Sequence, residues 1–397
     1  MAFKETLNNL SRRKFLSGSA LALTPIALNR FDLPASMAAA TLQSNKIITR
    51  KLGKTGIEIP IVSMGVMNAD NPAVVKASYE AGVRFFDTAA GYQMGRNEEM
   101  VGQVIKDLGV RKNVFIQTKL HVPKLPEADA VAKQILVDFD NCLKRLQMDY
   151  VDIFLVHGPT IEEMNAPGVK QAMAEVKKLK KARHIGVSTH MDQANIINDI
   201  TKNGFYDAVT VSYNFTQAQD TALLDAIKKA AAAGVGIIAM KTQASGRRGP
   251  NAPEGPQVNQ TAALKWVLRH PEITTAIPGY TNFDHMKEDF SVAYGLDYTN
   301  EEKKFLSERN LSASVQFCQQ CSECRGTCPN GVDVPTLMRT HMYAAKYGNF
   351  IHARTTLNEI ATNVSLKNCG DCTECDARCT NHVNIAENIR DLKAMYL

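Results

Sequence analysis

Short apolar segments alternate with longer amphipathic segments between about residues 47 and 311. Amphipathic stretches such as Ala130–Leu146 and Thr221–Ala233 carry apolar residues three and four positions apart, which predicts helices. The apolar runs predict eight strands, at 59–65, 83–87, 113–118, 151–156, 184–188, 208–212, 235–240 and 274–277. Eight strand–helix units in about 250 residues predict an α/β fold, a TIM (β/α)8 barrel. The alternative, a doubly wound open sheet, would carry a Gly-x-Gly-x-x-Gly turn after its first strand, and that turn is missing.

Polar residues follow the predicted strands at their C-terminal ends, where the active site of a barrel lies. Asp87 ends the second strand, with Tyr92 shortly after it, Lys119 follows the third strand and His157 follows the fourth. Because these strand ends converge at one mouth of a barrel, we expect the four side chains to meet. Singly, each has another interpretation: a helix cap, a loop aromatic, a strand-end lysine and a structural histidine. Jointly, at successive strand ends, they predict one site.

The four residue types suit proton transfer at a carbonyl group. A phenol has a pKa near 10, and a buried lysine beside it favours the phenolate and lowers that pKa. A carboxylate holds the lysine charged, and a histidine orients a carbonyl or hydroxyl group. The sequence therefore predicts a general acid–base that accompanies hydride transfer at a carbonyl carbon.

These residues lie in segments that resemble the aldo-keto reductase family over about residues 47–310. The further similar segments are Arg50–Gly56, Asp149–Asp152, Gly186–Ser188, Gln260–Val267 and Ile277–Gly279. The resemblance implies that Asp87, Tyr92, Lys119 and His157 form the family's catalytic tetrad. It also implies a barrel that binds an extended nicotinamide dinucleotide, NADP(H) or NAD(H), and acts on aldehydes, ketones or their alcohols.

The resemblance also indicates where a dinucleotide would bind. The matching positions are Ser188, Thr189, Thr210, Met240, Lys241, Pro278, Gly279 and His285. Thr189, Thr210 and Met240 stand where the family usually has asparagine, glutamine and a stacking tyrosine. NADP-binding members place lysine and arginine after Pro278, where this chain has only His285 to meet a phosphate. The acid–base residues therefore match the family more fully than the dinucleotide-binding residues.

Eight of the nine cysteines lie in two runs near the C-terminus. Both have the Cys-x2-Cys-x2-Cys-x3-Cys spacing of ferredoxins, followed by Pro329 in the first run and Thr380 in the second. In two-cluster ferredoxins the fourth cysteine of each run binds the other cluster. We therefore assign one [4Fe–4S] cluster to Cys318, Cys321, Cys324 and Cys379, and the other to Cys369, Cys372, Cys375 and Cys328.

Zinc and disulfide bonds are the competing interpretations of these cysteines. A zinc site usually takes two Cys-x2-Cys pairs, and the two four-cysteine runs exceed that need. Disulfide bonds within Cys-x2-Cys pairs would be redox-active rather than structural. The intervening stretches Thr336–Tyr347 and Phe350–Thr362 are helical in pattern. They resemble the all-helical two-cluster ferredoxin domain. We expect a barrel at 47–311 and a mostly helical iron–sulfur domain at 312–397.

The first 40 residues look like a twin-arginine export signal. Arg12 and Arg13 precede Phe15 and Leu16, a mildly apolar stretch follows at 21–28, and 38–40 is an alanine cleavage site. The apolar stretch is too short to span a bilayer. The signal predicts export of the folded protein to the periplasm. An uncleaved anchor and a frayed amphipathic N-terminus are the alternatives.

The net charge of +6 is spread along the chain, and its densest basic run, Lys177 to Lys181, is typical of a solvated helix face. We therefore expect no nucleic-acid partner. The patterns together predict an exported oxidoreductase that couples alcohol or carbonyl chemistry to electron transfer with a redox partner protein or membrane carrier. Two alternatives remain: a redox sensor with a non-catalytic barrel, and an electron-transfer subunit with the barrel as scaffold.

Overall fold

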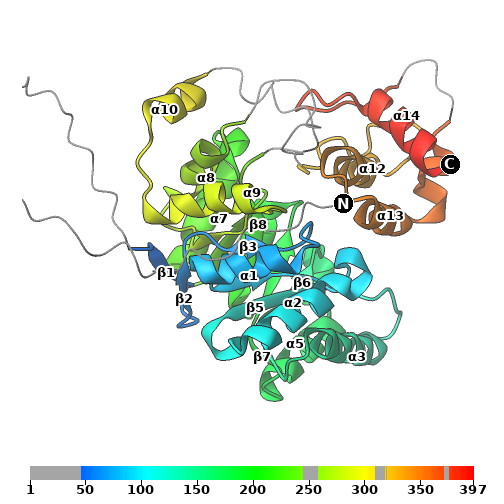
Figure 1. Cartoon of the computed structure of the whole chain (residues 1–397). Coiled ribbons are helices and arrows are strands. Elements are labelled where there is room, and N and C mark those ends of the chain that lie inside the picture. Colours follow the sequence, from blue (N-terminus) through cyan, green and yellow to red (C-terminus); the bar gives the residue numbers. More distant parts are fainter. Residues whose placement is uncertain (1–45, 245–257, 309–317, 319, 371–374) are drawn as a thin grey trace, which may run out of the picture. The chain divides into compact units, whose positions relative to one another are not determined.

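The computed structural model describes residues 46–244, 258–308, 318, 320–370 and 375–397 (Figure 1). Eight parallel strands follow one another in chain order around a single sheet, each paired with the next. They are β3 (Met64–Gly65), β4 (Phe85–Asp87), β5 (Phe115–Leu120), β6 (Val151–His157), β7 (Ala182–Thr189), β8 (Ala208–Ser212), β9 (Gly236–Met240) and β10 (Thr275–Ala276). The order of a (β/α)8 sheet is the one predicted from the sequence.

The sheet closes where its first and last strands meet. Val62 pairs in parallel with Ala276, and the Ser63 N–H donates to the Ala276 carbonyl at 2.8 Å. The Gly65 N–H donates to the Pro278 carbonyl at 3.1 Å. These bonds join β3 to β10, so the predicted TIM barrel is confirmed.

The chain enters the barrel through an antiparallel hairpin of β1 (Thr49–Lys51) and β2 (Glu58–Pro60). The single strand expected over 59–65 is therefore wrong, since its first residues belong to β2 and its last to β3. Proline has no N–H to continue a ladder, and the N–H of Ile61 returns to the Ile48 carbonyl. The apolar pattern is continuous across this change of partner.

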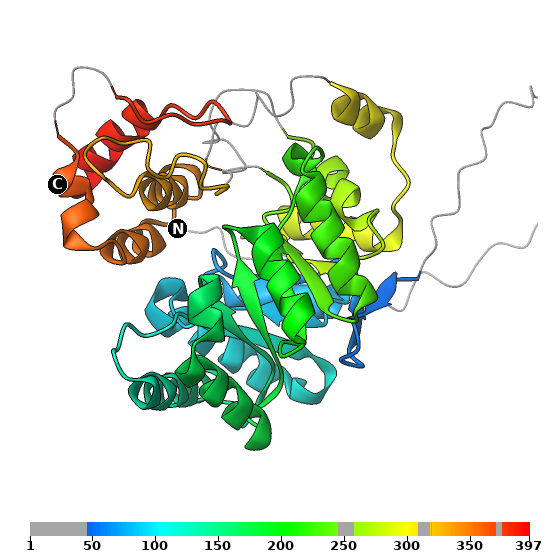
Figure 2. The same ribbon diagram turned by 180° about the vertical axis from the view of Figure 1, so that it is seen from behind.

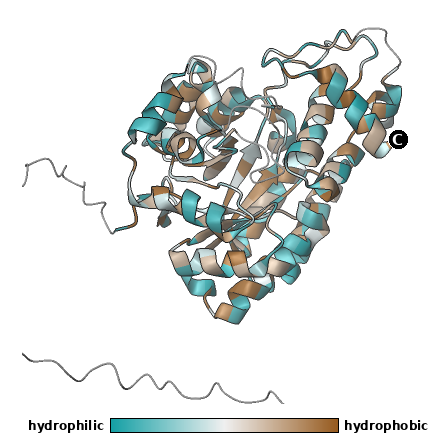
Figure 3. Ribbon diagram, turned by 45° about the horizontal axis from the view of Figure 1, so that its top comes forward, coloured by the Kyte–Doolittle hydropathy of each residue, from teal (hydrophilic) through white to brown (hydrophobic). Residues whose placement is uncertain are grey.

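The helices surround the strands, as the two opposite views show (Figures 1 and 2). They are α1 (Pro72–Ala81), α2 (Arg96–Leu108), α3 (Ala128–Leu146), α4 (Ile161–Asn165), α5 (Pro167–Lys178), α6 (Gln193–Asn203), α7 (Thr221–Ala232), α8 (Gln260–Leu268) and α9 (Phe283–Ser291). The two helices predicted at Ala130–Leu146 and Thr221–Ala233 are confirmed to within two residues. The strands are mainly apolar and the outer helix faces mainly polar (Figure 3). Phe139 of α3, for example, stacks on Phe154 of β6 at 4.1 Å.

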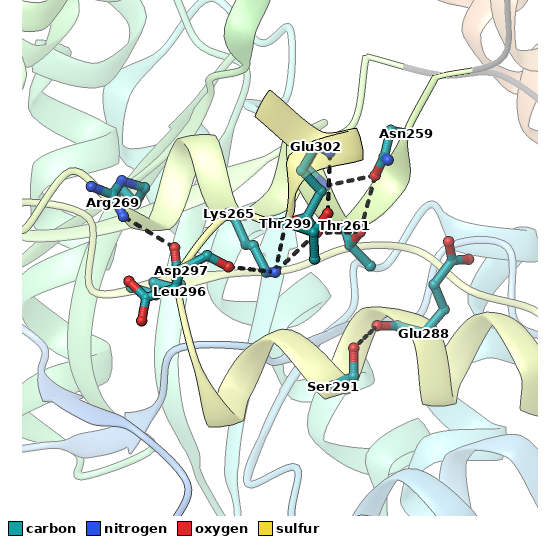
Figure 4. Close-up of polar contacts among 11 residues, drawn as sticks. Asn259, Thr261, Lys265, Arg269, Glu288, Ser291, Leu296, Asp297, Thr299 and Glu302 are labelled. Atoms are coloured by element: carbon teal, nitrogen blue, oxygen red, sulfur yellow. Dashed lines mark hydrogen bonds and ion pairs between the residues drawn. The ribbon is translucent and has the colours of Figure 1, made fainter. Parts of the chain in front are cut away.

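The helix α10 (Asn300–Ser307) is held against α8 by a buried ion pair (Figure 4). Lys265 Nζ lies 2.9 Å from both carboxylate oxygens of Glu302, and Thr261 donates to the same carboxylate at 2.8 Å. Glu302 also forms a capping box with Thr299 at the start of α10. Because removing one partner would leave a buried charge unpaired, this cluster fixes the path of the chain as it leaves the barrel.

The described part of the C-terminal region is helical and contains no strand. Its elements are α12 (Val334–His341), the π-helical turn η5 (Met342–Lys346), α13 (Phe350–Asn358), the short 3-10 turns η6 (Thr362–Val364) and η7 (Leu366–Asn368), and α14 (Ile385–Tyr396). Leu337, Met338, Leu366 and Leu392 form part of a separate core. The expected helical domain is confirmed, although the helix predicted at Phe350–Thr362 ends at Asn358.

Several expectations concern residues outside the described ranges. The export signal at 1–40 lies there, and the boundary expected between 311 and 312 falls in the gap at 309–317. The chain from Gln43 to Leu397 forms one compact unit that includes both the barrel and the C-terminal helices. No helix in the described ranges is long and apolar enough to cross a membrane.

Candidate functional site

The four predicted acid–base residues meet at the mouth of the barrel. Asp87 closes β4, Lys119 lies in β5, His157 closes β6, and Tyr92 opens the 3-10 turn η1 (Tyr92–Gly95). Lys119 Nζ lies 2.9 Å from each Asp87 carboxylate oxygen and 3.2 Å from the Tyr92 hydroxyl. All four side chains are buried. The strand-end prediction therefore placed these residues correctly, and their contacts suit proton transfer.

Gln117 supports this group and was missed by sequence reasoning. Its side-chain amide donates to the Asp87 carboxylate and, at 3.1 Å, to the Thr210 hydroxyl. Asp87 thus receives one amide and one ammonium, both from the neighbouring strand β5. Gln117 precedes Lys119 by two positions, and residues two apart on a strand share a face. The place of Gln117 on the same strand face as Lys119 was the available signal.

The backbone of η1 presents Tyr92 to the mouth. Gln93 and Met94, just after it, have φ values of 51° and 57°, in the left-handed region that non-glycine residues rarely adopt. Such conformations persist where the surroundings determine them, and they gather at functional sites. The sharp turn separates the buried tyrosine from Met94, which is 70% exposed.

Burial raises the pKa of Tyr92 well above its usual range, and the Asp87 carboxylate adds to this shift. The net shift is therefore opposite to the lowering that the sequence analysis expected from Lys119. The desolvation of the buried phenol outweighs the effect of the Lys119 ammonium 3.2 Å away, and burial also lowers the pKa of Lys119 itself. Tyr92 is a protonated phenol, ready to donate.

His157 is a neutral imidazole. Burial, with the charge of Lys119 and neighbouring histidines, lowers its pKa well below the usual value. The ring stacks on His121 at 4.2 Å and lies edge-on to Tyr92 at 6.1 Å. Its Nδ1 has no hydrogen-bond partner in the described residues. A neutral ring held beside Tyr92 can bind a substrate oxygen without adding charge.

A cavity of about 420 Å³ opens at this site, a size ordinary for small-molecule sites. Asp87, Tyr92 and His157 line it. So do five of the eight positions expected to bind a dinucleotide, namely Met240, Lys241, Pro278, Gly279 and His285. The tetrad and these positions therefore share one space.

The other three expected cofactor positions do not line the cavity. The Thr189 hydroxyl donates to the Met191 carbonyl at 2.6 Å, and Thr210 accepts from Gln117. The Ser188 hydroxyl is buried without a partner in the described residues. Of the three, only the Ser188 hydroxyl lacks any hydrogen-bond partner among the described residues.

Lys241 places a positive charge on the cavity wall. Its side chain pairs with no carboxylate among the described residues, and Nζ lies 5.1 Å from the Tyr343 ring and 5.5 Å from the Tyr347 ring. Burial and the nearby Arg339 lower the pKa of Lys241 to about 7. An anionic group in the cavity would stabilise the charged form, so Lys241 suits a phosphate.

A second cavity is lined by Cys318, Cys321, Cys324 and Cys379, the four residues assigned to one cluster. The first three come from one cysteine run and the fourth from the other, so the residues fit the exchanged-ligand arrangement. No group of three or more His, Cys, Asp or Glu in the described ranges surrounds a single ion position. A cubane binds its four thiolates at four different corners, so it needs no such point of convergence.

The second predicted cluster set is less fully described. Cys328, Cys369 and Cys375 all pack against the core of the C-terminal domain. Cys372 lies in the gap at 371–374. This set remains a prediction from the spacing.

The C-terminal domain contributes to the barrel's own cavity, which the sequence did not indicate. Tyr343, Tyr347 and His352 line it, and so does Cys318, which also lines the second cavity. Asn349 donates to the side chain of Asn68 at 2.9 Å and ties α13 to the barrel. No local pattern marks these residues, because their role depends on how the two domains pack.

The comparisons identify both domains. Residues 65–262 match the aldo/keto reductase family and residues 294–384 match a 4Fe-4S dicluster domain. The chain is therefore an oxidoreductase of the aldo-keto reductase family. It carries, in addition, an iron–sulfur domain with the cysteines of two clusters.

Individual relatives cover the barrel. L-galactose dehydrogenase of Arabidopsis thaliana is 27% identical over 66% of this chain and 93% of its own length. Glycerol 2-dehydrogenase (NADP(+)) of Saccharomyces cerevisiae is 39% identical over 31% of this chain and 36% of its own length. The structure of an aldo-keto reductase from Klebsiella pneumoniae in complex with NADPH has a TM-score of 0.53 at 22% identity, over 66% and 94% of the two chains. This structural likeness supports the fold.

Proposed function

We propose that this chain is an exported oxidoreductase that interconverts an alcohol and a carbonyl compound and exchanges electrons through two [4Fe–4S] clusters. The observation that carries the proposal is Cys318. This predicted cluster ligand lines the cavity of the catalytic tetrad as well as the cavity of cysteines. Carbonyl chemistry and electron transfer therefore have adjacent sites in one chain.

The residues of the barrel mouth suit a nicotinamide dinucleotide, which supplies hydride transfer when bound. Met240, Pro278 and Gly279 would line its path, and Lys241 and His285 would face its phosphates. One relative is named for NADP(+) and one similar structure contains NADPH. Lys241 offers an ammonium that a bound phosphate would keep charged, which the loop after Pro278 lacks.

The tetrad handles the proton that accompanies the hydride. In carbonyl reduction Tyr92 donates its proton to the carbonyl oxygen, while Lys119, held by Asp87, stabilises the phenolate that results. His157 binds the same oxygen and orients the carbonyl. In alcohol oxidation the proton returns to the Tyr92 phenolate. These roles follow from the short contacts of Lys119 and from the neutral state of His157.

The two clusters, held by the cysteines of the two runs, would supply one-electron transfer when bound. Oxidation of an alcohol to a carbonyl releases two electrons and two protons, and two clusters held by these cysteines would together have capacity for both electrons. The final acceptor or donor would be a redox protein or a membrane carrier. Because a nicotinamide gives up its electrons only as a hydride, joining the two reactions also requires a carrier, such as a flavin, that accepts a hydride and releases single electrons.

The coupling is tested by mixing the anaerobic holoenzyme, as isolated, with NADPH or with glycerol plus NADP⁺. We expect both clusters to become reduced, which electron paramagnetic resonance measures as up to about two spins per chain. Tyr92→Phe should abolish reduction by glycerol plus NADP⁺. Clusters that stay oxidised while an aldehyde is reduced would show that the two sites work separately.

Export is the second part of the proposal, and it is supported by the Arg12-Arg13 pair and the cleavage site at 38–40. Replacing both arginines by lysine keeps the charge and removes the planar guanidinium groups. We expect the protein to move from the periplasmic to the cytoplasmic fraction, measured by immunoblot.

Replacing Lys4 and Arg30 by alanine is the matched control, since these charges lie outside the motif. Mass spectrometry of the periplasmic protein should find an N-terminus near Thr41. If the double-lysine variant is exported as well as the native chain, the twin-arginine assignment is wrong.

A further inference from the structure

His352 of the iron–sulfur domain lies at the catalytic tyrosine of the barrel. Its ring is edge-on to Tyr92 at 5.5 Å and lies 4.4 Å from the ring of Tyr343. The side chain is 6% exposed and lines the tetrad cavity. A residue from outside the barrel therefore borders the place where a substrate would react.

The position of His352 is fixed from both domains. Asn349 caps α13 by accepting a hydrogen bond from the His352 N–H at 2.9 Å. The amide of the same Asn349 side chain donates to Asn68 of the barrel, also at 2.9 Å. One residue thus sets the start of α13 and anchors it to the barrel, which holds the ring beside Tyr92.

The two ring nitrogens of His352 differ in their surroundings. Neither is hydrogen-bonded by the described residues, and Nδ1 is buried. The ring lines the cavity, so Nε2 is the ring nitrogen left for a ligand to reach. Burial and the charges of Lys241 and Arg339 lower the pKa of His352 to about 3, which makes the ring neutral with one proton.

The proton of this neutral ring belongs on Nε2. A buried N–H without an acceptor costs more than a buried nitrogen lone pair that is merely unpaired. We assign the proton on this ground, as tautomers are assigned from hydrogen-bond networks. His352 then presents an Nε2–H donor to the cavity, on a ring that lies 5.5 Å from the ring of Tyr92.

Two more histidines share this pattern. His157 and His190 line the same cavity, have a buried Nδ1 without a partner in the described residues, and are neutral because burial lowers their pKa values. Among the described residues that line the cavity, the carboxylate of Asp87 is engaged by Lys119 and Gln117, and the ammonium of Lys241 is the group proposed above to face a cofactor phosphate. Several neutral donors around a small space suit an uncharged molecule with several oxygens.

We propose that His352 determines substrate specificity by donating a hydrogen bond from Nε2 to a hydroxyl group adjacent to the reacting carbonyl. The enzyme would select small uncharged hydroxy-aldehydes, hydroxy-ketones and the corresponding polyols over plain aldehydes and alcohols. This inference rests on the proposed alcohol–carbonyl chemistry of the barrel. It makes the iron–sulfur domain part of the substrate site.

The test compares glyceraldehyde with propanal, which has the same carbon chain without the two hydroxyl groups. Each is reduced by the holoenzyme with NADPH. In His352→Phe we expect the ratio of kcat/KM for glyceraldehyde to kcat/KM for propanal to fall about 10- to 100-fold, as for loss of a buried hydrogen bond. His352→Gln, whose amide reaches the place of Nε2, should restore part of the ratio, and His352→Asn should not.

The control is Asn358→Phe, which introduces the same ring at an exposed position of α13. It should leave the substrate ratio and the iron content per chain unchanged, and iron content should also be unchanged in His352→Phe. If His352→Phe slows both aldehydes equally, or neither, the proposed role is overturned. Rescue by asparagine but not glutamine would likewise overturn the assignment to Nε2.

Failure of the proposed barrel chemistry gives a different result. The native enzyme would then reduce neither aldehyde. In that case the role of His352 is decided by ligand binding, with glycerol and propan-1-ol compared by saturation-transfer NMR in the presence of NADP⁺. Selective loss of the glycerol signal in His352→Phe supports the inference. An unchanged glycerol signal contradicts it.

Discussion

Replacing Tyr92 by phenylalanine lowers kcat for carbonyl reduction by about 10²- to 10⁴-fold, the usual contribution of a positioned acid. The phenol is the proton donor nearest Lys119, at 3.2 Å, and phenylalanine keeps the ring contacts with His157 and His352. The measurement is steady-state reduction of propanal by NADPH, with iron content per chain determined on the same sample.

The matched control is Tyr294→Phe, which removes the same hydroxyl group outside the cavity, where the ring packs edge-on against Phe290 at 6.0 Å. Its activity and its iron content should both equal those of the native chain. Native turnover in Tyr92→Phe, with clusters intact, would exclude Tyr92 as the acid.

The pH dependence of the native enzyme tests the same residue. The pKa of Tyr92 is raised, so the phenol stays protonated up to and beyond its ordinary value near 10. Reduction should therefore be independent of pH from about 6 to 9, while oxidation, which needs the phenolate, should rise with pH across that range. A reduction rate that falls near neutral pH would assign the acid to another group.

Replacing Cys379 by alanine should remove one whole cluster. We expect the lost cluster to be the one bound mainly by the first cysteine run. Cys379 belongs to the second run by sequence but lines the cavity of Cys318, Cys321 and Cys324. Iron should fall from about eight to about four atoms per chain. The paramagnetic resonance spectrum of the reduced variant should match that of Cys324→Ala.

The reciprocal pair completes this test. Cys328→Ala should give the spectrum of Cys375→Ala, because both would bind the other cluster. Cys142→Ala, a change of a buried barrel cysteine, is the control and should keep all the iron. If Cys379→Ala instead resembles Cys375→Ala, each run binds its own cluster and the exchange of ligands is wrong.

The tetrad could be predicted because the carboxyl ends of the strands in a parallel barrel converge at one mouth, whatever the exact positions of the helices. Asp87, Lys119 and His157 each follow an apolar run, and that local signal survives without any tertiary information. Gln117 was available from its place on the same strand face as Lys119. The cysteine sites were likewise marked by spacing alone.

Other features depend on packing and could not be predicted. His352 and Tyr343 reach the tetrad cavity only because α13 and η5 pack at the barrel mouth, and no periodicity specifies that interface. The direction of the Tyr92 pKa shift was misjudged because it depends first on burial. The sequence shows a lysine near a tyrosine, but neither the depth at which the phenol is buried nor the nearby Asp87 carboxylate, which adds to the shift.

The cavity wall built from both domains has a consequence for how the protein matures. Cys318, Tyr343 and His352 belong to a domain whose cysteines require iron and sulfide, yet they also bound the space around Tyr92. Because metal binding is often coupled to the folding of the domain that holds it, we expect a chain without its clusters to lack this side of the cavity. Carbonyl reduction would then begin only after the clusters have been inserted.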